Sequence, residues 1–251
     1  MALTEGIILI LIGFIAGIIN TVSAGGSLLT LPLLLFVGLP ATEANATNRV
    51  AIVAQSITSI ITFKQKQSLQ LKRHAAIYIA AATGAAFGAL SALSISDQVF
   101  ILILALTMIT SIVFLIWNPI QAVDQSVVLT PIISFIGLAL FGFIGFYSGF
   151  IQVGVGFYIM ILAILLYKKS FAEATLIKIM IVGISVSLSL VIYAVNGQVN
   201  WLVGIVLAIG NIGGAFLGSR MVLGKHTQWI RIVLIVTVLI LAIRLMVEFF
   251  S

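Results

Sequence analysis

The feature that most constrains this chain is an internal duplication of its apolar sequence. Residues 13–117 align with residues 145–247, at an offset of 132 at the start and 130 afterwards. One two-residue gap near the first glycine cluster reconciles the two offsets. The matched pairs at an offset of 130 include Gly26 with Gly156, Glu43 with Glu173, Ser59 with Ser189, Gly84 with Gly214, Gly88 with Gly218 and Thr107 with Thr237. We therefore expect two related halves, repeat one at about 5–118 and repeat two at about 130–249.

The composition indicates that both halves lie in a membrane. The chain is 62% hydrophobic and only 7% charged, whereas about 25% of the residues of a soluble domain are charged. It contains no cysteine, which excludes disulfides and cysteine metal sites. We expect an all-α, polytopic membrane protein that forms a single transmembrane domain over residues 1–251, without a metal or another cofactor.

Each half contains five apolar segments. They lie at about 5–20, 26–38, 47–63, 75–94 and 98–117, and at about 130–151, 155–167, 174–195, 200–220 and 228–249. A helix that crosses the hydrocarbon core needs about 20 residues, but the two shortest segments, 26–38 and 155–167, supply only about 20 Å each. These short, broken segments are either tilted or re-entrant. Their irregular backbone must be enclosed by protein or must line a cavity.

The basic residues predict the orientation of the two halves. Because each half has an odd number of segments, the second half should be inverted relative to the first. With the N-terminus outside, ten of the twelve Lys and Arg residues lie in or near the connections 64–74, 168–173 and 220–227, which then face the cytoplasm. The counterpart of the basic connection 64–73 is the uncharged stretch 194–203. We therefore predict two inverted repeats in the cell (inner) membrane, with both termini outside.

Pairs of glycines four residues apart recur in both halves. They are Gly13/Gly17 with Gly145/Gly149, and Gly84/Gly88 with Gly214/Gly218. Such pairs let two helix backbones approach closely. We expect them to pack helices within the chain, and a homodimer contact is the alternative.

A first polar cluster interrupts the apolar sequence between Asn20 and Ser27. Its glycines permit close approach of a ligand to the backbone, and Ser27 begins the next helix, whose free N–H groups favour an anion. Interrupted helices at matched positions of two repeats are typical of transporter binding sites. The alternative is that the protein's own side chains fill the breaks. The candidate substrate-binding residues here and in the second half are Asn20, Thr21, Gly25, Gly26, Ser27, Gln152, Gly154 and Gly156.

A second polar cluster lies near the start of the third segment. Asn45 and Asn48 are one helical turn apart, and Arg49 adjoins them. Gln55 faces the same way as Asn48, and Lys178 is the residue that matches Asn48 in the second half. Because a basic residue at membrane depth costs a few kcal/mol unless it is paired or hydrated, Arg49 and Lys178 either snorkel to the surface or attract an anion. We add all five residues to the candidate substrate-binding set.

The acidic residues favour an anionic or neutral substrate over a cation. All six lie at predicted segment ends: Glu5, Glu43, Asp97, Asp124, Glu173 and Glu248. We interpret Glu43 and Glu173 as acids that stabilise the first turn of a helix, in preference to a functional role. A cation site or a carboxylate proton relay is therefore poorly supported. The sequence also contains no visible nucleophile–base pair, so we do not expect an enzyme.

One long motif resembles a known family. The run Gly17–Pro32, followed by Gly38–Pro40 and Ala44–Arg49, is similar to the signature of the TauE/SafE family of sulfite exporters. The similarity covers the whole chain, including the glycines at 145, 149 and 154. The resemblance implies a bacterial-type inner-membrane transporter of sulfite, sulfonates or related small organic anions. By this resemblance the motif positions are Asn20, Thr21, Gly25, Gly26, Ser27, Asn45, Asn48 and Arg49.

These observations predict a secondary transporter of a small anion that works by alternating access of its two halves. Backbone N–H groups and the Asn and Gln amides would replace the water shell of sulfite, a sulfonate or a carboxylate. Arg49 and Lys178 would attract the anion from opposite sides. The expected partners are this substrate and the lipid bilayer, and nucleic acid is not expected. The alternatives are a membrane interaction or assembly factor without transport, and a transporter of a neutral solute.

Overall fold

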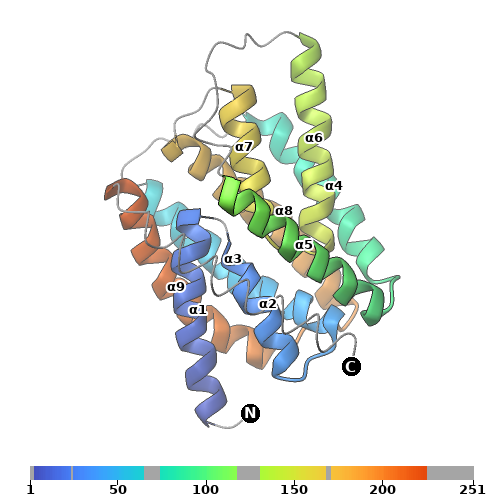
Figure 1. Ribbon diagram of the computed structural model, residues 1–251, viewed down its shortest axis with the longest axis vertical. Coiled ribbons are helices and arrows are strands. Elements are labelled where there is room, and N and C mark those ends of the chain that lie inside the picture. Colours follow the sequence, from blue (N-terminus) through green and yellow to red (C-terminus); the bar gives the residue numbers. More distant parts are fainter. Residues whose placement is uncertain (1–2, 24, 65–73, 118–130, 168–170, 225–251) are drawn as a thin grey trace.

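The computed structural model describes residues 3–23, 25–64, 74–117, 131–167 and 171–224. This part of the chain is all helical, as predicted, and the predicted segment 228–249 lies outside it. Figure 1 shows the helices, which are α1 (Leu3–Ser23), α2 (Ser27–Phe36), α3 (Ala41–Lys64), α4 (Ala75–Ala92), α5 (Asp97–Trp117), α6 (Pro131–Phe150), α7 (Val155–Tyr167), α8 (Phe171–Val195) and α9 (Trp201–Gly224).

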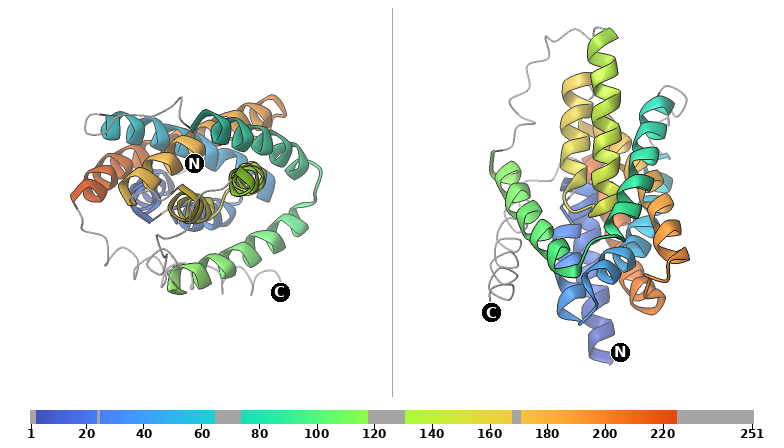
Figure 2. Two further views of the ribbon diagram at one scale, coloured as in Figure 1. Left: turned by 90° about the horizontal axis from the view of Figure 1, so that it is seen from above. Right: turned by 90° about the vertical axis from the view of Figure 1, so that its right-hand side faces the viewer.

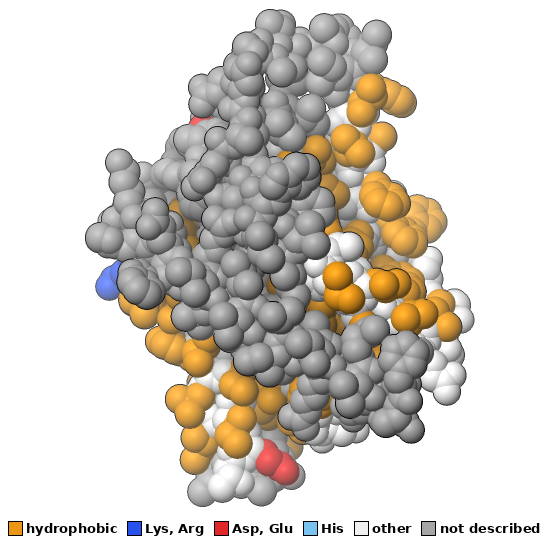
Figure 3. Space-filling model, viewed as in Figure 1, with side chains coloured by type: hydrophobic (Ala, Val, Ile, Leu, Met, Phe, Trp, Pro, Cys, Tyr) orange, Lys and Arg blue, Asp and Glu red, His pale blue; other side chains and the backbone are white. Residues whose placement is uncertain are grey.

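Helices suited to a membrane make up much of the described chain. Stretches of α1, α4, α8 and α9 are long and apolar enough to cross a bilayer, and shorter apolar helices lie among them. Large apolar side chains such as Leu11, Phe87, Phe143 and Val195 are exposed on the outside. Figure 3 shows apolar side chains over much of the described surface on that face, with few charges between them. Such a surface suits lipid, and the chain is a multi-pass membrane protein.

The helix α3 begins earlier than the apolar pattern predicts. It starts at Ala41, directly after Pro40, whereas the apolar segment starts at 47. The polar residues Asn45, Asn48 and Arg49 are helical and almost completely buried, at 0–2% exposure. The boundary was wrong because hydropathy treats polar residues as loop, whereas here other helices cover them.

Two helical hairpins enter the molecule from opposite ends. In Figure 1 and the right-hand view of Figure 2, α1 rises from the lower end and α2 returns toward it, while α6 descends from the upper end and α7 returns upward. The turn between α1 and α2 includes the buried residues Gly25 and Gly26, and the turn between α6 and α7 is buried from Ile151 to Gly154. The short helices α2 and α7 thus run back toward the end at which their hairpins start.

Close helix pairs hold these hairpins in the bundle. The most extensive packing is between α1 and α9 and between α4 and α6. A Cβ atom at Gly13 would lie only 2.6 Å from the Leu207 carbonyl oxygen on α9, and one at Gly145 would lie 2.6 Å from the Cα atom of Ala81 on α4. The glycine pairs therefore pack helices within the chain, as predicted. The long helices α3 and α8 pack against each other, and both carry the polar residues of the site.

Candidate functional site

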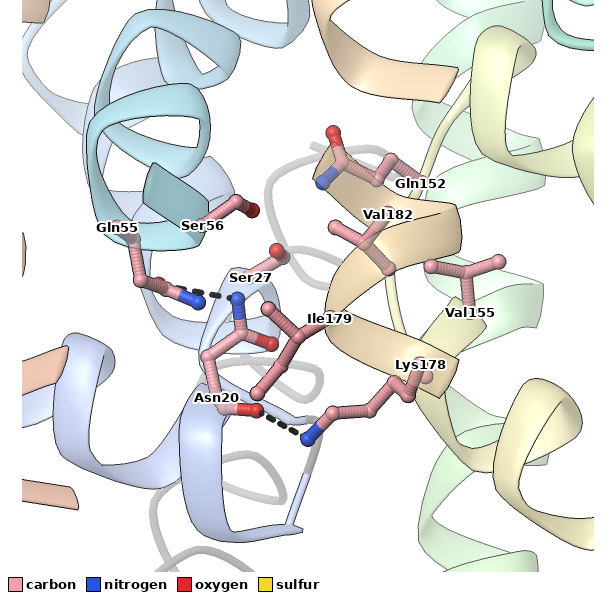
Figure 4. A pocket seen from close by; sticks show the side chains of 10 residues that line it. Asn20, Ser27, Gln55, Ser56, Gln152, Val155, Lys178, Ile179 and Val182 are labelled. Carbon is pink, nitrogen blue, oxygen red and sulfur yellow. Dashed lines mark hydrogen bonds between the residues drawn. The ribbon is translucent and has the colours of Figure 1, made fainter. Parts of the chain in front are cut away.

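A small cavity lies between the two buried turns and the helices α3 and α8 (Figure 4). Its volume is about 10 Å³ for the centre of a water-sized sphere, which is room for about one water molecule. Six of the thirteen predicted substrate-binding residues line it, although they are spread from residue 20 to residue 178 of the sequence. They are Asn20, Ser27, Gln55, Gln152, Gly156 and Lys178.

The amino ends of two helices lie on this cavity. Ser27 is the first residue of α2, and Val155 and Gly156 are the first two residues of α7. The N–H groups of Val155 and Phe157 donate to the carbonyls of Gln152 (3.3 Å) and Gly154 (3.0 Å), whereas no described residue accepts a hydrogen bond from the N–H of Gly156. The positive ends of two helix dipoles thus meet at one place, an arrangement that favours an anion.

Amide side chains supply further polar groups. Asn20 Nδ2 donates to Gln55 Oε1 at 3.1 Å and so connects α1 to α3. Gln152 is only 3% exposed, and its buried Oε1 has no hydrogen-bond partner among the described residues. The backbone of Gln152 has a φ of 64°, in the left-handed region that disfavours L side chains. The Gln152 side chain thus places an amide at the cavity, although the backbone of this residue has a conformation that glycine would adopt more easily.

Lys178 brings a cation to the cavity wall. Its Nζ atom donates to the backbone carbonyls of Asn20 at 3.0 Å and Thr21 at 2.8 Å, both in the last turn of α1. Figure 4 shows the side chain extending from α8 toward Asn20. A cation is stabilised at the negative end of a helix dipole. Because an ammonium group has three N–H donors, these two bonds leave one donor without a partner among them.

Arg49 lies in a second buried cluster that does not line the cavity. Its Nη1 donates to the Ser148 carbonyl at 3.0 Å and its Nη2 to the Gly149 carbonyl at 2.7 Å, at the carboxyl end of α6. The guanidinium lies 4.8 Å from the ring centroid of Tyr193. Asn45 Nδ2 donates to the Phe150 carbonyl at 2.8 Å, so Arg49 and Asn45 hold the same helix end.

The other predicted residues support the turns or lie within α3. Thr21 contacts Lys178 through its carbonyl, and its hydroxyl lies 3.5 Å from that of Ser59. Gly25 and Gly26 form the turn before α2, and their carbonyls accept its first hydrogen bonds. Gly154 has a φ of 69° in the turn before α7. Asn48 is buried, and no described residue bonds to its Oδ1.

Four lining residues were missing from the prediction. Ser56 adjoins Gln55 on α3, Val155 begins α7, and Ile179 and Val182 follow Lys178 on α8. Val182 is four residues beyond Lys178 and therefore on the same helix face. That spacing could have identified Val182, but an apolar residue in an apolar helix carries no signal of its own.

The acidic side chains of the described chain lie in the first turns of helices and do not line the cavity. Glu5, Glu43, Asp97 and Glu173 lie in the first turns of α1, α3, α5 and α8. No described carboxylate lines the cavity or bonds to Arg49 or Lys178. Asp124 and Glu248 fall outside the described residues. Within the described residues, no group of His, Cys, Asp and Glu could hold a metal ion.

Sequence comparisons match the chain to one family and to several proteins over most of its length. The profile of the family "Sulfite exporter TauE/SafE" matches residues 9–245. The chain is 29% identical to the "Probable membrane transporter protein ORF9" of a Sinorhizobium species, over 94% of this chain and 90% of that protein. It is 29% identical to a "Probable membrane transporter protein" of Haemophilus influenzae, over 89% of this chain and 88% of that protein. It is 26% identical to the "Probable membrane transporter protein YfcA" of Escherichia coli, over 96% of this chain and 89% of that protein. No solved structure is significantly similar to the chain.

Proposed function

Because the chain belongs to the sulfite exporter TauE/SafE family, and is therefore a membrane transporter rather than an enzyme, we propose that it carries a small anion through the cavity between α2 and α7. The observation that carries this proposal is the convergence of two helix amino ends on one cavity, beside the ammonium group of Lys178. No described carboxylate offsets this positive potential. A cation would be repelled here, whereas an anion would find N–H donors on several sides.

The chemistry of the lining suits a compact oxyanion such as sulfite, a sulfonate or a small carboxylate. The Gly156 N–H, the third Nζ–H of Lys178 and the amides of Asn20, Gln55 and Gln152 supply donors around one centre. Hydrogen bonds to a charged group contribute about 1.5–3 kcal/mol each after the loss of its bonds to water is counted, so a few of them favour a bound anion. Val155, Ile179 and Val182 form an apolar part of the wall, beside the hydroxyl residues Ser27 and Ser56.

The small size of the cavity supports alternating access. Room for about one water molecule is too little for sulfite, so the substrate must enter a wider form of the same site. We propose that the two halves are inverted repeats and that their relative movement opens the cavity to each side in turn. Two observations support the repeats: α1 and α6 run in opposite directions, and the pair α1–α9 corresponds to the pair α6–α4 under the sequence duplication.

Ligand-dependent stability of the purified protein tests the function. Sulfite, ethanesulfonate, acetate and a neutral sugar would be compared at constant ionic strength, because a ligand that binds only the folded state raises the melting temperature. We expect stabilisation by at least one of the anions and its saturable flux in proteoliposomes. The substitution Gln55→Met, which removes a lining amide, should weaken the anion's binding about tenfold, as expected for the loss of about 1.4 kcal/mol. Lys64→Gln, at the exposed end of α3, is the control with unchanged affinity.

The same assay separates the two alternatives. An assembly factor would be stabilised by none of the solutes, and its proteoliposomes would leak no faster than empty ones. A transporter of neutral solutes would be stabilised by the sugar and not by the anions. Either result would overturn the anion proposal.

A further inference from the structure

The carboxyl ends of α1 and α6 each accept hydrogen bonds from a basic side chain of another helix. At the end of α1, Lys178 of α8 bonds to the carbonyls of Asn20 and Thr21 at 3.0 and 2.8 Å. At the end of α6, Arg49 of α3 bonds to the carbonyls of Ser148 and Gly149 at 3.0 and 2.7 Å. A helix that ends inside a membrane leaves such carbonyls without partners. Here two cations of the chain itself satisfy them.

In transporters with interrupted helices, carbonyls at these places typically coordinate a coupling ion such as Na⁺. In this chain the same oxygens already accept hydrogen bonds from Lys178 and Arg49. A sodium ion bound to them would lie within a few ångströms of a fixed positive charge. At that distance two like charges repel by about 4 kcal/mol at an effective dielectric constant of about 20. Neither helix end therefore offers a sodium site while its basic residue is in place.

We propose that Lys178 and Arg49 occupy the positions of coupling cations, so that anion binding does not use Na⁺, and that Lys178 is the counter-charge of the transported anion. This inference rests on the proposed function of the cavity. In this inference a side chain of the protein supplies the positive charge that a coupling ion such as Na⁺ supplies in other transporters.

Lys178 lines the cavity and Arg49 does not, so we assign different roles to the two residues. Arg49 is 0% exposed and does not line the cavity, and Asn45 and Tyr193 also bond to the end of α6 that it holds. Arg49 is therefore a positioning residue for the α6–α7 turn. Lys178 lines the cavity and bonds to α1 at the same time. Only Lys178 can contact both an anion and a helix end.

Replacement of the Lys178 side chain by a small one tests the proposal directly. Lys178→Ala leaves the carbonyls of Asn20 and Thr21 without their ammonium partner and creates space for a small cation from solution. Binding of sulfite and ethanesulfonate to the purified protein would be measured by thermal shift in choline, sodium and ethylammonium chloride at equal ionic strength. Lys178→Met fills the space without a charge, and Lys64→Ala removes a charge at the exposed end of α3.

For the unchanged protein and for Lys64→Ala, we expect the affinity for these anions in choline chloride to be within twofold of that in sodium chloride. Lys178→Ala should bind at least tenfold more weakly in choline and regain affinity in ethylammonium, whereas Lys178→Met should be weak in all three media. If Lys178→Ala does not fold, the contrast of Lys178→Met with Lys178→Arg, which keeps the charge, decides the point. A sodium requirement of the unchanged protein, or full affinity of Lys178→Met in choline, would overturn the inference and leave the anion site standing. Absence of binding by the unchanged protein in every medium would overturn the proposed function, and this inference with it.

Discussion

At the scale of single residues, Gln152 combines an unfavourable backbone conformation with a place on the cavity wall. Among the described residues it is the only one other than glycine with a positive φ. A left-handed conformation costs an L residue about 1–2 kcal/mol. Gln152 also lines the cavity, where its side chain places an amide that glycine could not. Strain retained at a cavity wall is a common property of binding sites.

Two substitutions separate the backbone strain at Gln152 from the role of its amide. Gln152→Gly relieves the strain and removes the amide, whereas Gln152→Ala removes the amide and keeps the strain. We expect Gln152→Gly to be more stable than Gln152→Ala by about 1 kcal/mol, measured by thermal unfolding in detergent. Both should lose anion-dependent stabilisation to the same extent. Equal stability of the two variants would show that the positive φ costs nothing.

At the scale of helices, apolar length predicts most of the described elements but not their contacts. The apolar segments 26–38 and 155–167 are too short to span the bilayer comfortably, and the short helices α2 and α7 lie within them. The contact of Arg49 with the end of α6 joins residues about a hundred positions apart. No local pattern reports such a distance, because the direction in which a helix face points depends on the helices that pack around it. For the same reason the sequence placed Arg49 and Lys178 in one site, whereas only Lys178 lines the cavity.

Glycines on α6 provide a test of the packing with α4. Gly145 lies against the α4 backbone, where a Cβ would stand 2.6 Å from the Cα atom of Ala81, whereas a Cβ at Gly142 would meet nothing closer than the Ala80 carbonyl oxygen at 3.8 Å. We expect Gly145→Ala to destabilise the protein by about 1–3 kcal/mol through overpacking. Gly142→Ala should be neutral or slightly stabilising, because alanine favours a helix. Thermal unfolding of both variants measures the difference. Equal losses would contradict the close approach of α4 and α6 at Gly145.

At the scale of the whole molecule, the ends of the helices show on which side of the membrane domain the charged residues lie. In Figure 1, α3, α7 and α9 end at the upper side, where α4 and α8 begin, and α3 and α9 begin at the lower side. The basic residues Lys64 and Arg220 therefore belong to the upper side, as does Glu173 in the first turn of α8, while Glu43 belongs to the lower side. The position of these basic residues agrees with the positive-inside rule, which counts Lys and Arg, if the upper side faces the cytoplasm. The orientation of the hairpins in the membrane follows from the same assignment.

Labelling of single cysteines in intact cells tests this orientation, because the chain contains no cysteine of its own that could also be labelled. Asn196 and Lys64 are both exposed, at the lower end of α8 and at the upper end of α3. We expect a membrane-impermeant maleimide to label Asn196→Cys from outside, and Lys64→Cys only after permeabilisation. Lys64→Cys leaves seven of the eight basic residues in the cytoplasmic connections, so it should not invert the protein. The reverse pattern would place the α1–α2 hairpin on the cytoplasmic side. Labelling of both from one side would contradict the path of α3 and α8 across the membrane.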